Sequence, residues 1–167
     1  MTRHPTVVAA TVHAQTFCPG RLTQNSTSVK LGNTSLTVSR LSFGTVFMGQ
    51  RGDNLSAQEG ADLLLRAYQQ GISYWDTSED YGTHAHIACA LQRLPRNQVV
   101  ISSKLNLPAK PIEGLLEELA TSYVDILFIH DVSLDEVPAA RDTLQTWQEE
   151  KTKGGFKLLA FLPIAPW

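Results

Sequence analysis

The stretch YVDILFIH at residues 123–130 decides the fold. Apart from Asp125, residues 123–129 are apolar or aromatic. A short run of this kind predicts a strand that is buried on both faces of a parallel sheet. His130 stands directly at the end of that strand. The segments on either side should therefore supply further strands of the same sheet.

Strands and helices are expected to alternate on both sides of this stretch. Before it, residues 98–103 predict a strand and residues 112–119 a helix; after it, a helix over 139–147 and a strand over 156–162 follow. Nearer the N-terminus, Ser56 and Glu59 form a capping-box pattern for a helix that stops at Gly71. The remaining expected elements are a hairpin over 29–38, strands over 41–46 and 72–75, and a short helix over 86–91.

This alternation is the pattern of βαβ units around a parallel sheet. No G-x-G-x-x-G follows the first strand, which disfavours an open dinucleotide-binding sheet. The hairpin, which would plug the bottom of a barrel, favours the closed alternative. We therefore predict an α/β fold: an incomplete TIM (β/α)8-type parallel barrel of four to five βα units over residues 28–167. Residues 1–27 are expected to be a poorly ordered N-terminal extension.

Composition excludes several classes of function. The chain has 167 residues and a formal net charge of −2, without the basic footprint of a nucleic-acid-binding protein. No apolar run approaches the ~20 residues of a membrane span. Cys18 and Cys89 form no disulfide framework, which favours a reducing, cytoplasmic location. The first acidic residue is Asp53, so the N-terminus also carries a weak organelle-transit signal.

Four reactive residues fall at or just after the C-terminal ends of consecutive predicted strands. Asp76 ends one strand, Tyr81 follows in its loop, Lys104 ends the next strand and His130 ends the one after. In parallel barrels this end builds the active site. A buried charge without a partner costs several kcal/mol, so Asp76 and Lys104 should pair.

These four residue types together suit proton transfer. A lysine ammonium beside Tyr81 would stabilise its phenolate and make the hydroxyl a usable acid. Asp76 would orient Lys104, and His130 would hydrogen-bond a substrate carbonyl. Such a group fits protonation of an oxygen while hydride reaches carbon from a nicotinamide. Taken singly, each residue also fits a structural role.

The same residues resemble the aldo-keto reductase family. The resemblance runs from about Val29 to Lys153 and rests on KLGNTSLTVSRLSFGT, GISYWDTSEDYGTHAHIACAL, VVISSKL and YVDILFIH. It implies a TIM barrel, NADPH or NADH as hydride donor, a small-molecule carbonyl substrate and no metal. It implies the catalytic tetrad Asp76, Tyr81, Lys104 and His130, and places Gly44, Thr45 and Asp76 near the nicotinamide ribose.

Two departures from the family pattern stand out. Many members follow Y-G with S-E, whereas residues 83–86 read THAH, which we interpret as a variant of the substrate-side loop. A barrel of this kind needs ~250 residues, so the later strands and their cofactor contacts are expected to be missing. The closing residues 161–167 look unlike the family's fifth strand. Unpaired edge strands would then invite edge-to-edge self-association.

Two other functions remain open at this point. One is a non-catalytic, truncated relative that binds a partner or does nothing. The other is a metal-dependent barrel hydrolase that uses His84, His86 and His130, although two histidines two residues apart diverge on a helix. Glu79 and Asp80 are interpreted as solvated loop acids.

Overall fold

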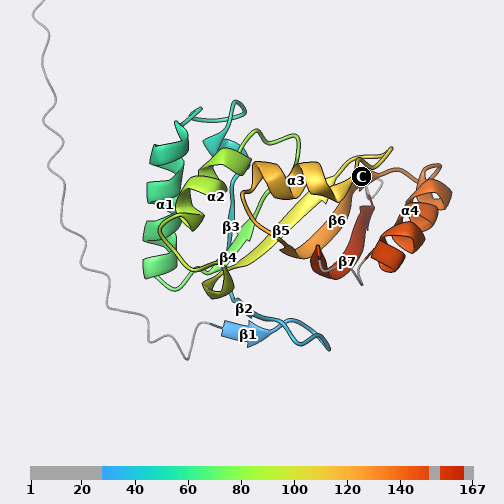
Figure 1. The fold of residues 1–167 in the computed structure, drawn as a ribbon, viewed down its shortest axis with the longest axis horizontal. Helices are drawn as coiled ribbons and strands as arrows, with labels where there is room; N and C mark the ends of the chain where they lie inside the picture. The colour runs from blue at the N-terminus through green and yellow to red at the C-terminus, as the bar shows by residue number, and fades with distance from the viewer. Residues whose placement is uncertain (1–27, 151–154, 164–167) are drawn as a thin grey trace, which may run out of the picture.

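The computed structural model describes residues 28–150 and 155–163. Five parallel strands form one sheet in the order β3-β4-β5-β6-β7, and an antiparallel hairpin, β1-β2, precedes them (Figure 1). The five strands pair in the order in which they follow one another along the chain. The bounds of the strands are β1 Ser28–Lys30, β2 Thr37–Ser39, β3 Ser42–Gly44, β4 Tyr74–Asp76, β5 Val100–Leu105, β6 Val124–Val132 and β7 Phe156–Pro163.

The helices lie between the strands, as βαβ units require. The loop after β3 contains the 3-10 turn η2, Val46–Met48, and leads into α1, Ala57–Gln69. Ser56 caps α1 through the predicted capping box with Glu59. The other helical segments are α2 His84–Leu91, η3 Arg96–Gln98, α3 Ile112–Glu118 and α4 Val137–Glu150.

The hairpin lies at the N-terminal end of β4, away from the predicted tetrad (Figure 1). The buried hydroxyl of Ser39 accepts hydrogen bonds from the backbone N–H groups of Ser73 and Tyr74, at 3.1 and 3.0 Å. Tyr74 is the first residue of β4, and Ser73 directly precedes it. The Ser39 side chain therefore fixes the hairpin to the N-terminal end of β4. This is the end at which the sequence predicted the hairpin to lie.

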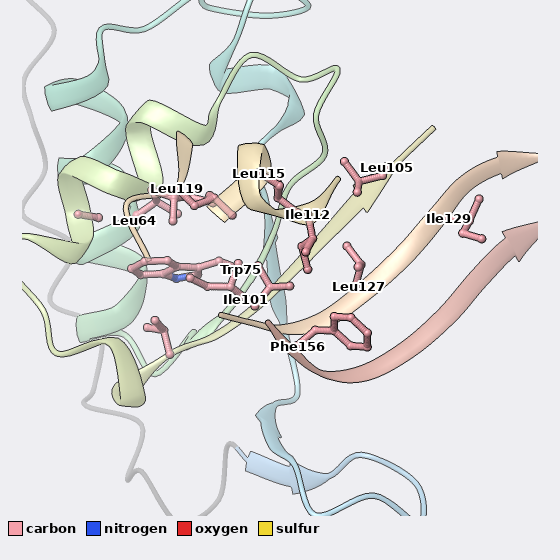
Figure 2. Packing of buried hydrophobic residues seen from close by; sticks show 14 of the residues in the cluster. Leu64, Trp75, Ile101, Leu105, Ile112, Leu115, Leu119, Leu127, Ile129 and Phe156 are labelled. Carbon is pink, nitrogen blue, oxygen red and sulfur yellow. The ribbon is translucent and has the colours of Figure 1, made fainter. Parts of the chain in front are cut away.

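The core fills the layer between the sheet and the helices. Trp75 in β4 is fully buried, and Figure 2 shows it beside Leu64 of α1 and Leu119 at the end of α3. Ile101 of β5 and Leu127 of β6 belong to the same cluster. Side chains alternate between the two faces of a strand, so the neighbours of Trp75, Ile101 and Leu127 along each strand point to the opposite face of the sheet. That face carries the reactive groups.

Most predicted elements are confirmed, with shifts at their ends. β5 begins at Val100 rather than at residue 98, because Arg96–Gln98 forms a 3-10 turn first. β3 ends at Gly44, and Val46 already belongs to η2. The predicted extension over residues 1–27 lies outside the described residues. None of the helices in the described residues combines the length and apolar composition that a bilayer span requires.

Candidate active site

The ends of β4 and β5 bring Asp76 and Lys104 together. Asp76 is paired in register with Ser102, and Lys104 lies two residues further along β5 on the same face. Asp76 accepts a hydrogen bond from each: Ser102 Oγ lies 2.7 Å from its Oδ1 and Lys104 Nζ lies 2.7 Å from its Oδ2. The predicted ion pair between Asp76 and Lys104 is confirmed as a contact of this site.

The ammonium of Lys104 is buried and has three acceptors. Besides Asp76, it donates to the carbonyl oxygen of Thr77 at 2.8 Å and to Tyr81 Oη at 3.4 Å. It also lies 4.8 Å from the centroid of the Tyr81 ring. Three acceptors match the three N–H bonds of an ammonium, so the Lys104 side chain is fixed. Because Tyr81 Oη accepts from Lys104, its own O–H remains free to donate.

His130 lies on the other side of Tyr81, next to a β-bulge. The pairing of β6 with β7 is irregular between Ile129 and Val132, and Asp131 has a positive φ of 49°. Bulges commonly re-aim side chains beside active sites. The ring of His130 lies edge-on to that of Tyr81, with centroids 6.0 Å apart. The structure thus brings all four predicted residues to one end of the sheet.

Three polar groups surround the imidazole of His130, and the sequence did not single out two of them. Its Nδ1 lies 3.2 Å from Ser78 Oγ and 3.6 Å from Asp80 Oδ1, while its Nε2 lies 3.6 Å from Asp131 Oδ1. Their positions depend on the loop after β4 and on the bulge. The periodicity of a strand predicts neither the conformation of this loop nor the position of a bulge.

Asp80 also touches a cation at the rim of the site. Its Oδ2 lies 2.8 Å from an Nη of Arg51, whose guanidinium lies 5.8 Å from the centroid of the Tyr81 ring. Partial burial raises the pKa of Asp80, but the hydrogen bond from Ser78 and the charges of His130 and Arg51 outweigh it, so its pKa lies below the usual range. Asp80 is therefore ionised beside Tyr81 at neutral pH.

The interpretation of Glu79 as a solvated loop acid is wrong. Its side chain is 13% exposed, and it accepts hydrogen bonds from the backbone N–H of Asn106 at 2.6 Å and from Lys110 Nζ at 2.8 Å. Burial raises the pKa of Glu79, but these donors outweigh it and hold the pKa below its usual range. The Glu79 N–H also donates to the Lys104 carbonyl, which ties the Tyr81 loop to β5.

Gly44 and Thr45 were predicted to lie near a nicotinamide ribose. They differ in exposure and in how far their polar groups are already hydrogen-bonded. Gly44 is exposed, and a Cβ built on it would meet no atom within 4 Å. Free space therefore adjoins Asp76, with which Gly44 is paired in register. Thr45 is fully buried: its hydroxyl is 2.7 Å from that of Thr83, and its N–H donates to the Asp76 carbonyl. The carbonyl of Thr45 accepts a hydrogen bond from the Met48 N–H at 2.9 Å, so each polar group of Thr45 already has a partner within the chain.

The described residues thus fit the reactive end of a nicotinamide cofactor better than its phosphates. Open space borders the hydrogen-bonded pair of Asp76 and Lys104. Phosphates would require unpaired cations. Arg51 and Lys110, the exposed cations beside the Tyr81 loop, are already engaged by carboxylates.

Residues 83–86, which we interpreted as a variant of the substrate-side loop, lie at the start of α2, with Thr83 as its N-cap. Thr83, His84 and His86 are buried, and only Ala85 is exposed. His84 Nδ1 lies 2.6 Å from Glu118 Oε2, whereas His86 Nε2 lies 2.9 Å from a backbone carbonyl. Within the described residues, no group of three His, Cys, Asp or Glu side chains could hold a metal ion. The hydrolase alternative therefore has no ligand set in this part of the chain.

Comparisons with known proteins identify the family to which the chain is similar. A model of the Aldo/keto reductase family matches residues 40–160. The chain is 32% identical over 124 residues to a protein named probable aldo-keto reductase 1 from Glycine max, covering 62% of this chain and 36% of that protein. It is 29% identical over 155 residues to L-galactose dehydrogenase from Arabidopsis thaliana, covering 80% and 48%. The chain thus spans between a third and a half of these relatives.

A solved structure shows the same architecture. A putative aldo-keto reductase from Pseudomonas aeruginosa superposes with a TM-score of 0.72 at 26% identity, covering 86% of this chain and 62% of that one. The predicted partial (β/α)8-type barrel, preceded by a hairpin, is confirmed. With the family model matching most of its length and the barrel matching in structure, the chain belongs to the aldo/keto reductase family.

Proposed function

We propose that this chain carries the proton-transfer site of an NAD(P)H-dependent carbonyl reductase, which reduces aldehydes or ketones to alcohols. The observation that supports this most strongly is the environment of Lys104. Its ammonium contacts Asp76 at 2.7 Å and Tyr81 Oη at 3.4 Å. This is the arrangement that a tyrosine needs in order to act as an acid and be left as a stabilised phenolate.

In the proposed reaction each residue has one task. Tyr81 donates its hydroxyl proton to the carbonyl oxygen of the substrate, and the resulting phenolate lies against the Lys104 ammonium. Asp76 holds Lys104 in place through their ion pair. His130, edge-on to the Tyr81 ring, would orient the carbonyl by a hydrogen bond.

The proposed cofactor is NADPH, with NADH as the alternative. When bound, the reduced nicotinamide supplies the hydride that the carbonyl carbon receives. Gly44 and Asp76 border the open space that would receive the nicotinamide end. The proton from Tyr81 and the hydride together convert the carbonyl to an alcohol.

The test is a titration of the full chain with NADPH, and separately with NADH, followed by intrinsic tryptophan fluorescence. Saturable micromolar binding is expected. Reduction of a panel of aromatic and aliphatic aldehydes is then measured for the wild type and for Tyr81→Phe, which removes only the hydroxyl. We expect Tyr81→Phe to bind cofactor equally and to lose about 100-fold or more in kcat.

Two outcomes would contradict the proposal. Equal turnover by Tyr81→Phe would exclude Tyr81 as the proton donor. Absence of binding up to millimolar cofactor, from a folded sample, would favour the alternative that this chain is a non-catalytic relative.

A further inference from the structure

We propose that Thr83 is a positioning residue for Tyr81, and that the segment Thr83–His84–Ala85–His86 serves as the fixed end of the loop that carries Tyr81. The inference rests on the proposed function, in which Tyr81 is the proton donor and must be held in a fixed position. It goes beyond the tetrad to residues at which this sequence departs from the common family pattern. The observations that carry it are buried hydrogen bonds and one close backbone approach.

Thr83 joins the ends of two strands through a buried cluster of hydroxyls. Its Oγ1 lies 2.7 Å from Thr45 Oγ1, just after β3, and 3.0 Å from Thr77 Oγ1, just after β4. All three side chains are fully buried. A hydroxyl has one donor and two acceptor sites, so Thr83 can satisfy both neighbours at once. Loss of the Thr83 hydroxyl would leave the buried hydroxyls of Thr45 and Thr77 without this partner, which is unfavourable for buried polar groups.

Thr83 makes these contacts instead of capping a helix. It is the N-cap residue of α2, where a threonine side chain ordinarily accepts a hydrogen bond from the first turn. Its side chain makes no such bond. A capping hydrogen bond stabilises a helix end, so the inward hydroxyl forgoes that stabilisation at the start of α2. The inward contacts fix the position two residues after Tyr81.

A second contact fixes the backbone of Tyr81 itself. A Cβ built on Gly49 would collide with the carbonyl oxygen of Tyr81 and would lie 3.1 Å from Thr83 Cγ2. The backbone at Gly49 therefore packs directly on the Tyr81 peptide. Gly49 stands at the end of η2, which follows β3. The loop after β3 thus supports the same loop from a second side.

The two histidines extend this support to the helices. His84 Nδ1 lies 2.6 Å from Glu118 Oε2, at the end of α3. His86 Nε2 lies 2.9 Å from the carbonyl oxygen of Leu55, ahead of α1. Glu79 precedes Tyr81 in the loop and accepts a hydrogen bond from the N–H of Asn106, directly after β5. The loop is therefore held by hydrogen bonds both before and after Tyr81. A displacement of the reacting group by about 1 Å can cost 100-fold in rate.

The test follows Tyr81 directly by NMR, independently of activity. Tyrosine labelled with 13C at Cζ gives one signal for each of the four tyrosines, and Tyr81→Phe identifies the Tyr81 signal. Thr83→Val keeps the shape of the side chain and removes the hydroxyl; it is expected to shift the Tyr81 signal and leave the other three unchanged. Thr83→Ser, which restores the hydroxyl, should return the signal. Thr37→Val, on the exposed face of β2, is the matched control.

Kinetics provide the second readout. Thr83→Val should lower kcat about 10- to 100-fold without changing the dissociation constant for NADPH, and Thr83→Ser should recover most of it. If Thr83→Val does not fold, Thr45→Val removes the same hydrogen bond from the other side. An unmoved Tyr81 signal in the folded variant would overturn the proposal. A shifted signal in a chain whose wild type shows no turnover would uphold the positioning role and reject the proposed function.

Discussion

At the scale of single residues, Gly60 shows that close packing can outweigh helix propensity. Gly60 is a buried glycine in α1, where alanine would ordinarily be favoured by about 1 kcal/mol. A Cβ at this position would collide with His86 Cδ2 and lie 2.9 Å from Met48 Cε. We expect Gly60→Ala to lower the free energy of unfolding by about 1–3 kcal/mol in urea denaturation.

Gly114 provides the matched control for this prediction. It is an exposed glycine within α3, and a Cβ there would meet nothing within 4 Å. Gly114→Ala is expected to stabilise the chain by about 0.5–1 kcal/mol. If both substitutions stabilised equally, the close approach of Gly60 to the His86 ring would have no energetic weight.

The residues of the site were predictable to different degrees, for physical reasons. Asp76, Lys104 and His130 could be placed near strand ends because parallel strands align their C-terminal ends. Asp76 ends β4 as predicted, whereas β5 continues to Leu105 and β6 to Val132, beyond Lys104 and His130. Thr83 could not, because the direction of a side chain at a helix start depends on tertiary contacts. Its THAH segment was interpreted as a variant of the substrate-side loop, although most of its side chains are buried.

At the scale of elements, the loop between β4 and α2 is held by an ionised carboxylate. Glu79 accepts from the Asn106 N–H and from Lys110, and its pKa in the folded chain is lowered despite its burial. A lowered folded-state pKa means that the stabilisation is present at neutral pH. It is lost as pH falls from about 4.3, the ordinary value for a glutamate, through the folded-state pKa.

Glu79→Gln is therefore expected to lower the free energy of unfolding by about 1–3 kcal/mol at pH 7, because the partly buried N–H of Asn106 loses its charged acceptor. The difference from the wild type should shrink below about pH 4, where Glu79 becomes protonated. Urea denaturation of both proteins between pH 3 and pH 7 measures this. Glu113→Gln, on the exposed side of α3, is the control. A constant difference across that range would contradict the ionic role of Glu79.

The elements themselves were predicted best where a local signal marked their ends. The start of α1 was placed correctly because the capping box of Ser56 and Glu59 is a local pattern. The helix expected from residue 86 begins at His84 instead, and its N-cap Thr83 makes no capping hydrogen bond. The start of β5 shifted because Arg96 holds a 3-10 turn, donating to the Val99 and Tyr123 carbonyls and to Asp125.

At the scale of the whole molecule, the sheet has two edges that lack partners among the described residues. β3 and β7 are the first and last strands of the five-stranded sheet. In a complete barrel such edges are paired, and the inner face is filled from all sides. Here Leu158 of β7 pairs in register with Ile126 and stays half-buried on the face that carries Asp76.

We therefore expect the 167-residue chain, produced by itself, to associate through the edge of β7 and the adjoining inner face. Light scattering coupled to size-exclusion chromatography should show a mass above that of one chain, which rises with concentration. Leu158→Lys places a charge beside the edge and should reduce association. Leu134→Lys is the control, because Leu134 is 75% exposed in the loop after β6 and does not belong to the edge. Equal effects of both substitutions would indicate nonspecific apolar association. A monodisperse monomer that melts cooperatively would show that five strands and four helices close their core without a partner.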